Sequence, residues 1–168
     1  LNRYPDGNAT SFKEVVSQIE KIKTSMITVG HGSNDLIEFV SKCFLSEGDN
    51  AIYSQHGFAI YPLAIKSTGA KAIKAKSRDW GHDLNLMKDL VDENTKVIFL
   101  ATPNNPTGTV LESNVVEEFL DAIPYNIDVF IDQAYFEYIE EDKYKISFDL
   151  VKKYKNLIIS RSFSKAHG

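Results

Sequence analysis

The stretch that decides the fold runs from residue 96 to residue 132. It opens with the apolar segment KVIFLA (96–101), continues with the turn sequence TPNNPTG (102–108), and ends with a second apolar segment, IDVFID (127–132). Such short apolar runs are typical of strands that are buried on both faces. Between them, apolar residues recur at helical spacing: Val115, Val116, Phe119, Leu120 and Ile123. A strand, a helix and a strand in this order predict two parallel strands joined by a crossover helix.

The same alternation extends in both directions from this stretch. Further strands are expected at 26–29, 51–53, 70–75 and 156–160, and helices are expected to begin near Ser11, Ser33, Phe58, Asp83 and Ser147. Ser11 and Glu14 have the spacing of a capping box, and Ser33 and Asp83 are suited to cap helix N-termini. The pattern predicts the α/β class, with a mostly parallel sheet and helices on both faces.

Composition narrows the class of protein. The 168 residues are 43% hydrophobic and 25% charged, values that are ordinary for a globular domain and unlike those of disordered or collagen-like chains. With 19 basic and 23 acidic residues the net charge is −4, which argues against nucleic-acid binding. The single cysteine, Cys43, excludes an intrachain disulfide and fits a reducing compartment. No apolar run approaches 18 residues, so we expect a cytoplasmic protein without membrane spans.

The chain begins at Leu1 rather than at a methionine and stops at Gly168, directly after a polar cluster. We therefore expect it to be a piece of a longer protein, truncated at both ends.

Functional residues are expected just after the strands, because ligands of parallel α/β sheets bind outside the carboxyl ends of the strands. The segments in question are 30–35, 54–58, 102–109, 132–135 and 162–165. The first, GHGSND, joins glycines to a helix N-terminus, which suits a phosphate group, although an ordinary capped turn has the same features. Asp35 stands where a dinucleotide-binding fingerprint would need its third glycine, and no Walker A pattern is present.

The other segments carry groups with both structural and chemical interpretations. The turn at 103–108, which carries two asparagines, either forms a rigid surface loop or presents an Asn side chain to a ligand. Asp132 ends an apolar strand, where a carboxylate is costly unless it is paired, so it forms either a structural pair or a partner for a ligand cation. Tyr135 is either packed or directed into the same crevice, and Lys165 is either solvated or a nucleophile and base. The four histidines lack metal-ligand spacing, so no metal is expected.

Taken together, these motifs resemble the pyridoxal-phosphate enzymes of the aspartate-aminotransferase fold. Finer detail resembles the histidinol-phosphate aminotransferase branch, in the motifs NRYP (2–5), GSND (32–35), SQHGFAIYP (54–62), GHDL (81–84) and SRSFSKA (160–166). The resemblance covers about the middle half of a family member. It implies that residues 1–168 form an incomplete cofactor-binding large domain of fold type I, and that the small C-terminal domain is absent from this chain.

The resemblance also implies a role for each site residue. Lys165 would carry pyridoxal 5′-phosphate as a Schiff base, and Asp132 would face the pyridine nitrogen. Asn105 and Tyr135 would hold the phenolic oxygen, and Phe58 would stack on the ring. The remaining residues would bind the phosphate: Ser33, Asn34, Ser162 and, from the partner subunit of a homodimer, Tyr4.

The implied reaction moves an amino group between histidinol phosphate and 2-oxoglutarate, a step of histidine biosynthesis. An aromatic or aspartate aminotransferase, a threonine-phosphate decarboxylase, or a non-catalytic fragment that serves as a binding module remain alternatives. Gln133 departs from the family pattern, where Glu is common, and His167 replaces a usual aromatic residue. The arginines that grip the phosphate and the substrate carboxylate in the family would follow Gly168. We therefore expect the isolated 168-residue piece to be inactive.

Overall fold

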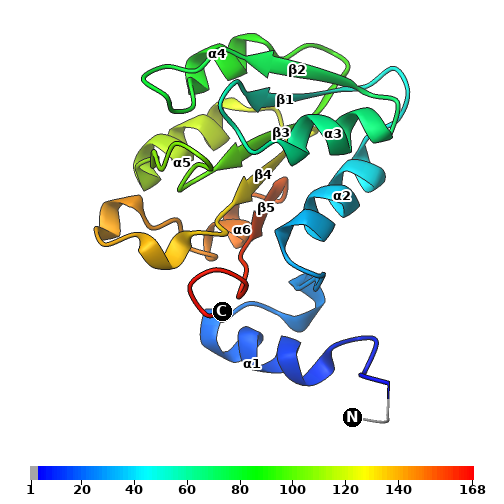
Figure 1. Ribbon diagram of the computed structural model, residues 1–168, viewed down its shortest axis with the longest axis vertical. Helices are drawn as coiled ribbons and strands as arrows, with labels where there is room; N and C mark the ends of the chain where they lie inside the picture. The colour runs from blue at the N-terminus through cyan, green and yellow to red at the C-terminus, as the bar shows by residue number, and fades with distance from the viewer. Residues whose placement is uncertain (1–3) are drawn as a thin grey trace.

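The computed structural model describes residues 4–168 (Figure 1), so Asn2 and Arg3 of the N-terminal motif lie outside the described residues. Five strands form one sheet in the order β2-β1-β3-β4-β5, and all four ladders between them are parallel. The strands are β1 (Asn50–Ser54), β2 (Lys71–Ala75), β3 (Thr95–Ala101), β4 (Asp128–Asp132) and β5 (Leu157–Ser160). The predicted parallel sheet is confirmed.

Helices cover both faces of the sheet, as the alternation predicts (Figure 1). They are α1 (Thr10–Glu20), α2 (Ser33–Phe44), α3 (Ile60–Ser67), α4 (Leu84–Asp89), α5 (Ser113–Ala122) and α6 (Leu150–Lys153), with short 3-10 turns η1 (Thr24–Met26), η2 (Phe136–Tyr138) and η3 (Asp142–Tyr144). Helices α2 and α3 pack on one face, whereas α4, α5 and α6 pack on the other. Within residues 4–168, no helix is both long enough and apolar enough to span a bilayer.

The central strand β3 shows why the sheet is buried on both faces. Val97 and Phe99 lie in the cluster beneath α2 and α3, whereas Ile98 and Leu100 lie in the cluster beneath α5. All four side chains are fully buried, because successive residues of a strand point to opposite faces. A continuous apolar run is therefore what this central position requires.

The predicted strand at 26–29 is wrong. Residues 24–26 form the turn η1, and Ile27 is extended, with φ −113° and ψ 121°, but the segment joins no ladder among residues 4–168. An apolar run favours extended backbone, but a strand also needs a neighbouring strand with free hydrogen-bonding groups, and the segment leads instead into α2.

The predicted caps are confirmed at one of three helices. Asp83 caps α4 and accepts a hydrogen bond from the N–H of Leu86 at 3.0 Å. The predicted capping box at Ser11 is wrong, because α1 begins at Thr10 and the carboxylate of Asp6 accepts the N–H of Thr10 instead. Ser33 is the first helical residue of α2 rather than its cap. Gly32 takes the cap position with φ 76°, a left-handed conformation that favours glycine.

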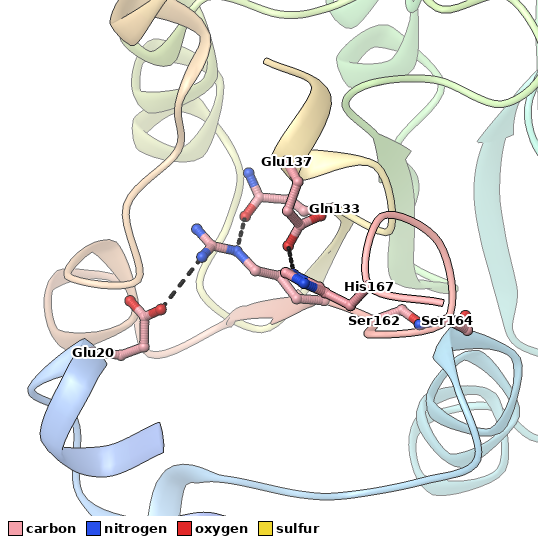
Figure 2. A network of polar contacts seen from close by, with 7 residues as sticks. Glu20, Gln133, Glu137, Ser162, Ser164 and His167 are labelled. Carbon is pink, nitrogen blue, oxygen red and sulfur yellow. Dashed lines mark hydrogen bonds and ion pairs between the residues drawn. The ribbon is translucent and has the colours of Figure 1, made fainter. Parts of the chain in front are cut away.

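Helix α1 contacts the sheet side of the molecule through Arg161, which follows β5. Its guanidinium lies 3.4 Å from the ring centroid of Phe136 and pairs with Glu20 of α1 at 3.4 Å. Its Nε donates to Gln133 Oε1 at 3.4 Å (Figure 2). This stacked cation joins α1 to the ends of β4 and β5.

The strand order reverses at β1, since β2 lies on one side of it and β3 on the other. The segments that leave β1 and β3 therefore diverge above the sheet, which creates a crevice at the carboxyl ends of these strands. This is the point at which the site lies.

Candidate active site

A cavity of about 270 Å³ lies at the carboxyl ends of the strands. It is lined by seven of the nine residues that the sequence predicts for the site: Ser33, Asn34, Phe58, Asn105, Asp132, Tyr135 and Lys165. Separate segments supply them: α2 begins with the first two, Asp132 ends β4, and the others follow β1, β3, β4 and β5. Parallel strands end at one edge of a sheet, so residues 132 positions apart in the sequence meet there.

Two predicted residues do not line the cavity. Ser162 is buried, and its hydroxyl lies 2.6 Å from that of Ser164, which lines the cavity in its place. The second serine of the SFSK motif, rather than the first, therefore reaches the cavity, at a point where the chain bends after β5. Tyr4 is fully exposed and does not line the cavity, so its expected role in a partner subunit is not tested by a single chain.

Asp132 is the buried charge of the site, with 5% of its surface exposed. Its Oδ1 accepts the N–H of Ala134 at 3.0 Å and the hydroxyl of Ser160 at 3.1 Å. Its Oδ2 accepts the hydroxyl of Tyr61 at 3.3 Å. Burial raises the pKa of Asp132, whereas these three donors and the charge of Lys165 act in the opposite direction. The donors provide what a buried carboxylate needs to carry its charge.

Tyr61 is a site residue that sequence reasoning missed. It lies in α3, is fully buried, and lines the cavity next to Asp132. Its apolar neighbours along α3 are typical of a core position, which hides its polar role. The available signal is its spacing, because a residue three positions after Phe58 lies on the same side of a helical turn.

Lys165 supplies the amine of the site. It lies in the segment that follows β5, and its Nζ is 5.6 Å from the ring centroid of Tyr135. Both side chains line the cavity that Asp132 also lines. A primary amine and a buried carboxylate thus share one solvent-accessible space, as the sequence predicts.

The turn after β3 separates a structural amide from one that lines the cavity. Asn104 is buried, and its Nδ2 donates to the carbonyl of His56 at 2.9 Å and to the hydroxyl of Thr107 at 2.8 Å. The backbone carbonyl of Asn104 also accepts the N–H of Gly108 at 2.8 Å. Asn104 therefore fixes the shape of the turn, and this shape directs the next residue, Asn105, into the cavity.

The N-terminus of α2 forms another wall of the cavity. The first N–H groups of a helix have no partner within the helix, and the helix dipole gives this end a partial positive charge. Ser33 and Asn34 stand at this end and line the cavity. The carboxylate of Asp35 accepts the N–H of His31 at 2.9 Å and so holds the preceding turn. This wall is suited to an anionic group such as a phosphate.

The lining as a whole fits a flat ring with a basic nitrogen and an anionic substituent. Asp132 offers a carboxylate to the nitrogen, Phe58 an aromatic face, the start of α2 an anion site, and Lys165 an amine. In the part of the chain from residue 4 onward, no group of three or more His, Cys, Asp and Glu side chains is arranged to hold a metal ion.

Comparisons with known proteins agree with this chemistry. The family model for aminotransferase class I and II matches residues 1–168. Histidinol-phosphate aminotransferase 1 of Idiomarina loihiensis is 45% identical over all of this chain and 46% of its own length. Histidinol-phosphate aminotransferase 2 of Pseudomonas fluorescens (strain Pf0-1) is 42% identical over all of this chain and 45% of its own length. The chain thus spans about half the length of these curated relatives.

Solved structures show the same fold. A histidinol-phosphate aminotransferase from Sinorhizobium meliloti, in complex with pyridoxal-5′-phosphate, superposes with a TM-score of 0.93 at 23% identity, covering 99% of this chain and 45% of that one. An L-threonine-O-3-phosphate decarboxylase from Porphyromonas gingivalis gives 0.85 at 23% identity, covering 99% and 48%. The expected architecture, that of the fold-type I enzymes, is confirmed. Because the family model matches the whole chain, the chain belongs to the class I and II aminotransferases.

Proposed function

We propose that the protein carrying this chain is a pyridoxal-phosphate-dependent aminotransferase that moves an amino group between histidinol phosphate and 2-oxoglutarate. The observation that carries the proposal is the meeting of Lys165, Asp132, Asn105 and Tyr135 around one cavity. The named substrate is supported by curated relatives called histidinol-phosphate aminotransferases, which are 41–45% identical over the whole chain.

The cavity residues fit pyridoxal phosphate in charge and shape. When bound, the cofactor supplies an electron sink for bond breaking at the substrate's α-carbon. Asp132 would keep the ring nitrogen protonated, and Asn105 and Tyr135 would hold the phenolic oxygen. Phe58 would cover one face of the ring, and the start of α2, with Ser33 and Asn34, would bind the phosphate. The Nζ of Lys165 would hold the cofactor covalently.

Lys165 would also act as the base of the reaction. When it is not bonded to the cofactor, its Nζ would take the proton from the α-carbon of the substrate and later give that proton up. A base placed in this way contributes roughly 10²–10⁴-fold to the rate. The three donors to Asp132 favour its charged form, and all of them belong to this chain rather than to the substrate: Ser160 lies in β5, Tyr61 in α3 and Ala134 in the segment after β4.

Three further proposals follow from the family. The protein is a homodimer in which Tyr4 reaches the phosphate site of the partner subunit, which agrees with the full exposure of this side chain. Residues 1–168 form part of the large cofactor-binding domain, and a separate small domain completes the substrate site. The enzyme acts in the cytoplasm on small amino and keto acids.

The test uses the full-length protein that carries this sequence. We expect it to absorb visible light after loading with pyridoxal phosphate and to form glutamate from histidinol phosphate and 2-oxoglutarate. Lys165→Ala is expected to abolish both the absorption band and the turnover, whereas Lys155→Ala, at an exposed lysine outside the cavity, is expected to change neither. A band that persists in Lys165→Ala would contradict the role of this lysine.

A substrate panel separates this proposal from its alternatives. Release of carbon dioxide from threonine phosphate would identify a decarboxylase, and faster turnover of aspartate or an aromatic amino acid would identify a different aminotransferase. A protein that takes up no cofactor would be the non-catalytic binding module. Each of these results would contradict the proposed substrate.

A further inference from the structure

We propose that Tyr61 is a positioning residue of this site, whose hydroxyl keeps the carboxylate of Asp132 ionised and fixed in orientation toward the cavity. The inference rests on the proposed function, because the partner of this carboxylate would be the ring nitrogen of pyridoxal phosphate. Tyr61 acts through Asp132 rather than on the substrate.

The ring of Tyr61 is held from several sides. It stacks on Phe99 with 5.2 Å between ring centroids and 20° between planes, and its edge meets Phe58 at 6.0 Å and 90°. It has no exposed surface. Close packing of this kind restricts side-chain rotation, so the hydroxyl has a fixed position from which to donate. That position is 3.3 Å from Oδ2 of Asp132.

The turn before α3 is shaped around this ring. A Cβ added at Gly57 would lie 3.0 Å from the carbonyl of Ser54 and 3.4 Å from Cδ2 of Tyr61. Glycine therefore lets the backbone pass close to the tyrosine. The N–H of Tyr61 donates to the carbonyl of Phe58 at 3.1 Å, which ties the two aromatic residues together through the backbone as well.

The two oxygens of Asp132 have different partners, and this difference gives Tyr61 its role. Oδ1 accepts two donors, from Ala134 and Ser160, whereas Oδ2 accepts the hydroxyl of Tyr61. A carboxylate oxygen has two acceptor sites, so Oδ2 retains a second one for a ligand. Tyr61 thereby fixes the rotation of the carboxyl group and leaves that site available. The same ring supports Phe58, so one side chain positions two walls of the cavity.

Titratable groups that face Asp132 come from two directions. Tyr61 approaches from α3 and Lys165 from the segment after β5, while His31 and Tyr135 line the same cavity. Burial raises the pKa of Tyr61 well above its usual value, so the tyrosine keeps its proton and donates at every physiological pH. Burial also raises the pKa of Asp132, and the hydrogen bond from Tyr61 opposes this effect.

The experiment follows the carboxyl carbon of Asp132 by NMR in the cofactor-free, full-length protein, with ¹³C-labelled aspartate and Asp132→Asn for assignment. In Tyr61→Phe the titration midpoint of Asp132 is expected to move upward by about one pH unit, since one hydrogen bond to a charged acceptor is lost. The matched control is Tyr154→Phe. Tyr154 is also buried and donates to an aspartate, Asp121, at 2.7 Å, but it lies outside the cavity. The Tyr154→Phe variant is expected to leave the titration midpoint of Asp132 unchanged.

An unchanged midpoint in Tyr61→Phe, or an equal change in both variants, overturns the inference. If Tyr61→Phe does not fold, the unaltered protein provides the test, because the hydroxyl proton of Tyr61 is expected to shift as Asp132 titrates. A Tyr61 hydroxyl signal that does not shift as Asp132 titrates also overturns the inference. Because no cofactor is present, this measurement is independent of the proposed function. Loading with pyridoxal phosphate then tests the link to the site, with binding expected to be about tenfold weaker in Tyr61→Phe than in Tyr154→Phe.

Discussion

Asp132 and Ser160 are register partners at the ends of the neighbouring parallel strands β4 and β5, and the hydroxyl of Ser160 donates to Oδ1 of Asp132 at 3.1 Å. Both side chains are buried. The pairing of two strands therefore supplies one of the three donors that a buried carboxylate needs. A change at Ser160 affects the site through this carboxylate, without removing any residue that lines the cavity.

Ser160→Ala is expected to lower the free energy of unfolding by about 1.5–3 kcal/mol, because it removes a hydrogen bond to a charged acceptor. The matched control is Ser67→Ala, which removes a bond to the neutral carbonyl of Ala64 and is expected to lower it by about 0.5–1.5 kcal/mol. Urea denaturation at neutral pH measures both. Equal losses would show that Asp132 does not need this donor.

Asp132→Asn is expected to change the dependence of stability on pH. Burial raises the pKa of Asp132 above the value of the unfolded chain, so the folded protein binds this proton more tightly. The contribution of Asp132 to the free energy of unfolding is therefore largest below the pKa that this group has in the unfolded chain. It is lost as the pH rises through the pKa that the group has in the folded protein. The variant cannot ionise, so its stability relative to the unaltered protein should rise from acidic to neutral pH. Urea denaturation of both proteins across this pH range tests the prediction, and a difference in unfolding free energy that does not change with pH would contradict it.

The turnover of Asp132→Asn should also fall, by about 10²–10³-fold.

The two asparagines of the turn after β3 are expected to respond differently to alanine. Asn104→Ala removes the hydrogen bonds to His56 and Thr107 and should lower the free energy of unfolding by about 1–3 kcal/mol. Asn105→Ala should change stability by less than about 0.5 kcal/mol but weaken cofactor binding, because this side chain lines the cavity. Each variant is the control for the other. Denaturation measures the stability and cofactor titration measures the binding. The assignment would be contradicted if Asn105→Ala lost stability while Asn104→Ala lost only cofactor binding.

Arg161→Lys is expected to loosen α1 although it keeps the charge. The planar guanidinium lies against the rings of Phe136 and Phe148, at 3.4 and 4.3 Å from their centroids, and an ammonium cannot reproduce this stacking. A loss of about 2 kcal/mol in unfolding free energy is expected, together with faster proteolysis within α1. Lys153→Met, which alters an exposed cation over Tyr154, is the control and should have little effect. Unchanged proteolysis of α1 in Arg161→Lys would show that the ion pair with Glu20 is enough.

Much of this arrangement could be predicted from the sequence, because its strands are buried on both faces and each is followed by polar residues. The segments KVIFLA and IDVFID form the central strands β3 and β4, with Asp132 at the end of β4, as predicted. The side chains that line the cavity follow from the rule that parallel strands end at a common edge.

The remaining features depend on contacts that local patterns do not contain. Residues 26–29 are apolar, but no ladder partner is available to them among residues 4–168. The choice between Ser162 and Ser164 depends on how the chain leaves β5, and the role of Tyr61 depends on a partner 71 positions away. Asp6 replaces the predicted cap of α1 because its carboxylate reaches the helix from a preceding turn.

The parallel ladder between β4 and β5 has one more consequence. Lys165 and Asp132 lie on segments whose relative offset is fixed by the pairing of Asp132 with Ser160. Sliding β5 by one residue would displace it by about 3.3 Å and turn each of its side chains to the opposite face. The amine and the acid would then no longer share the cavity. Catalytic turnover in a folded preparation would accordingly report whether these two strands are aligned, with a sensitivity that bulk measures of secondary structure do not have.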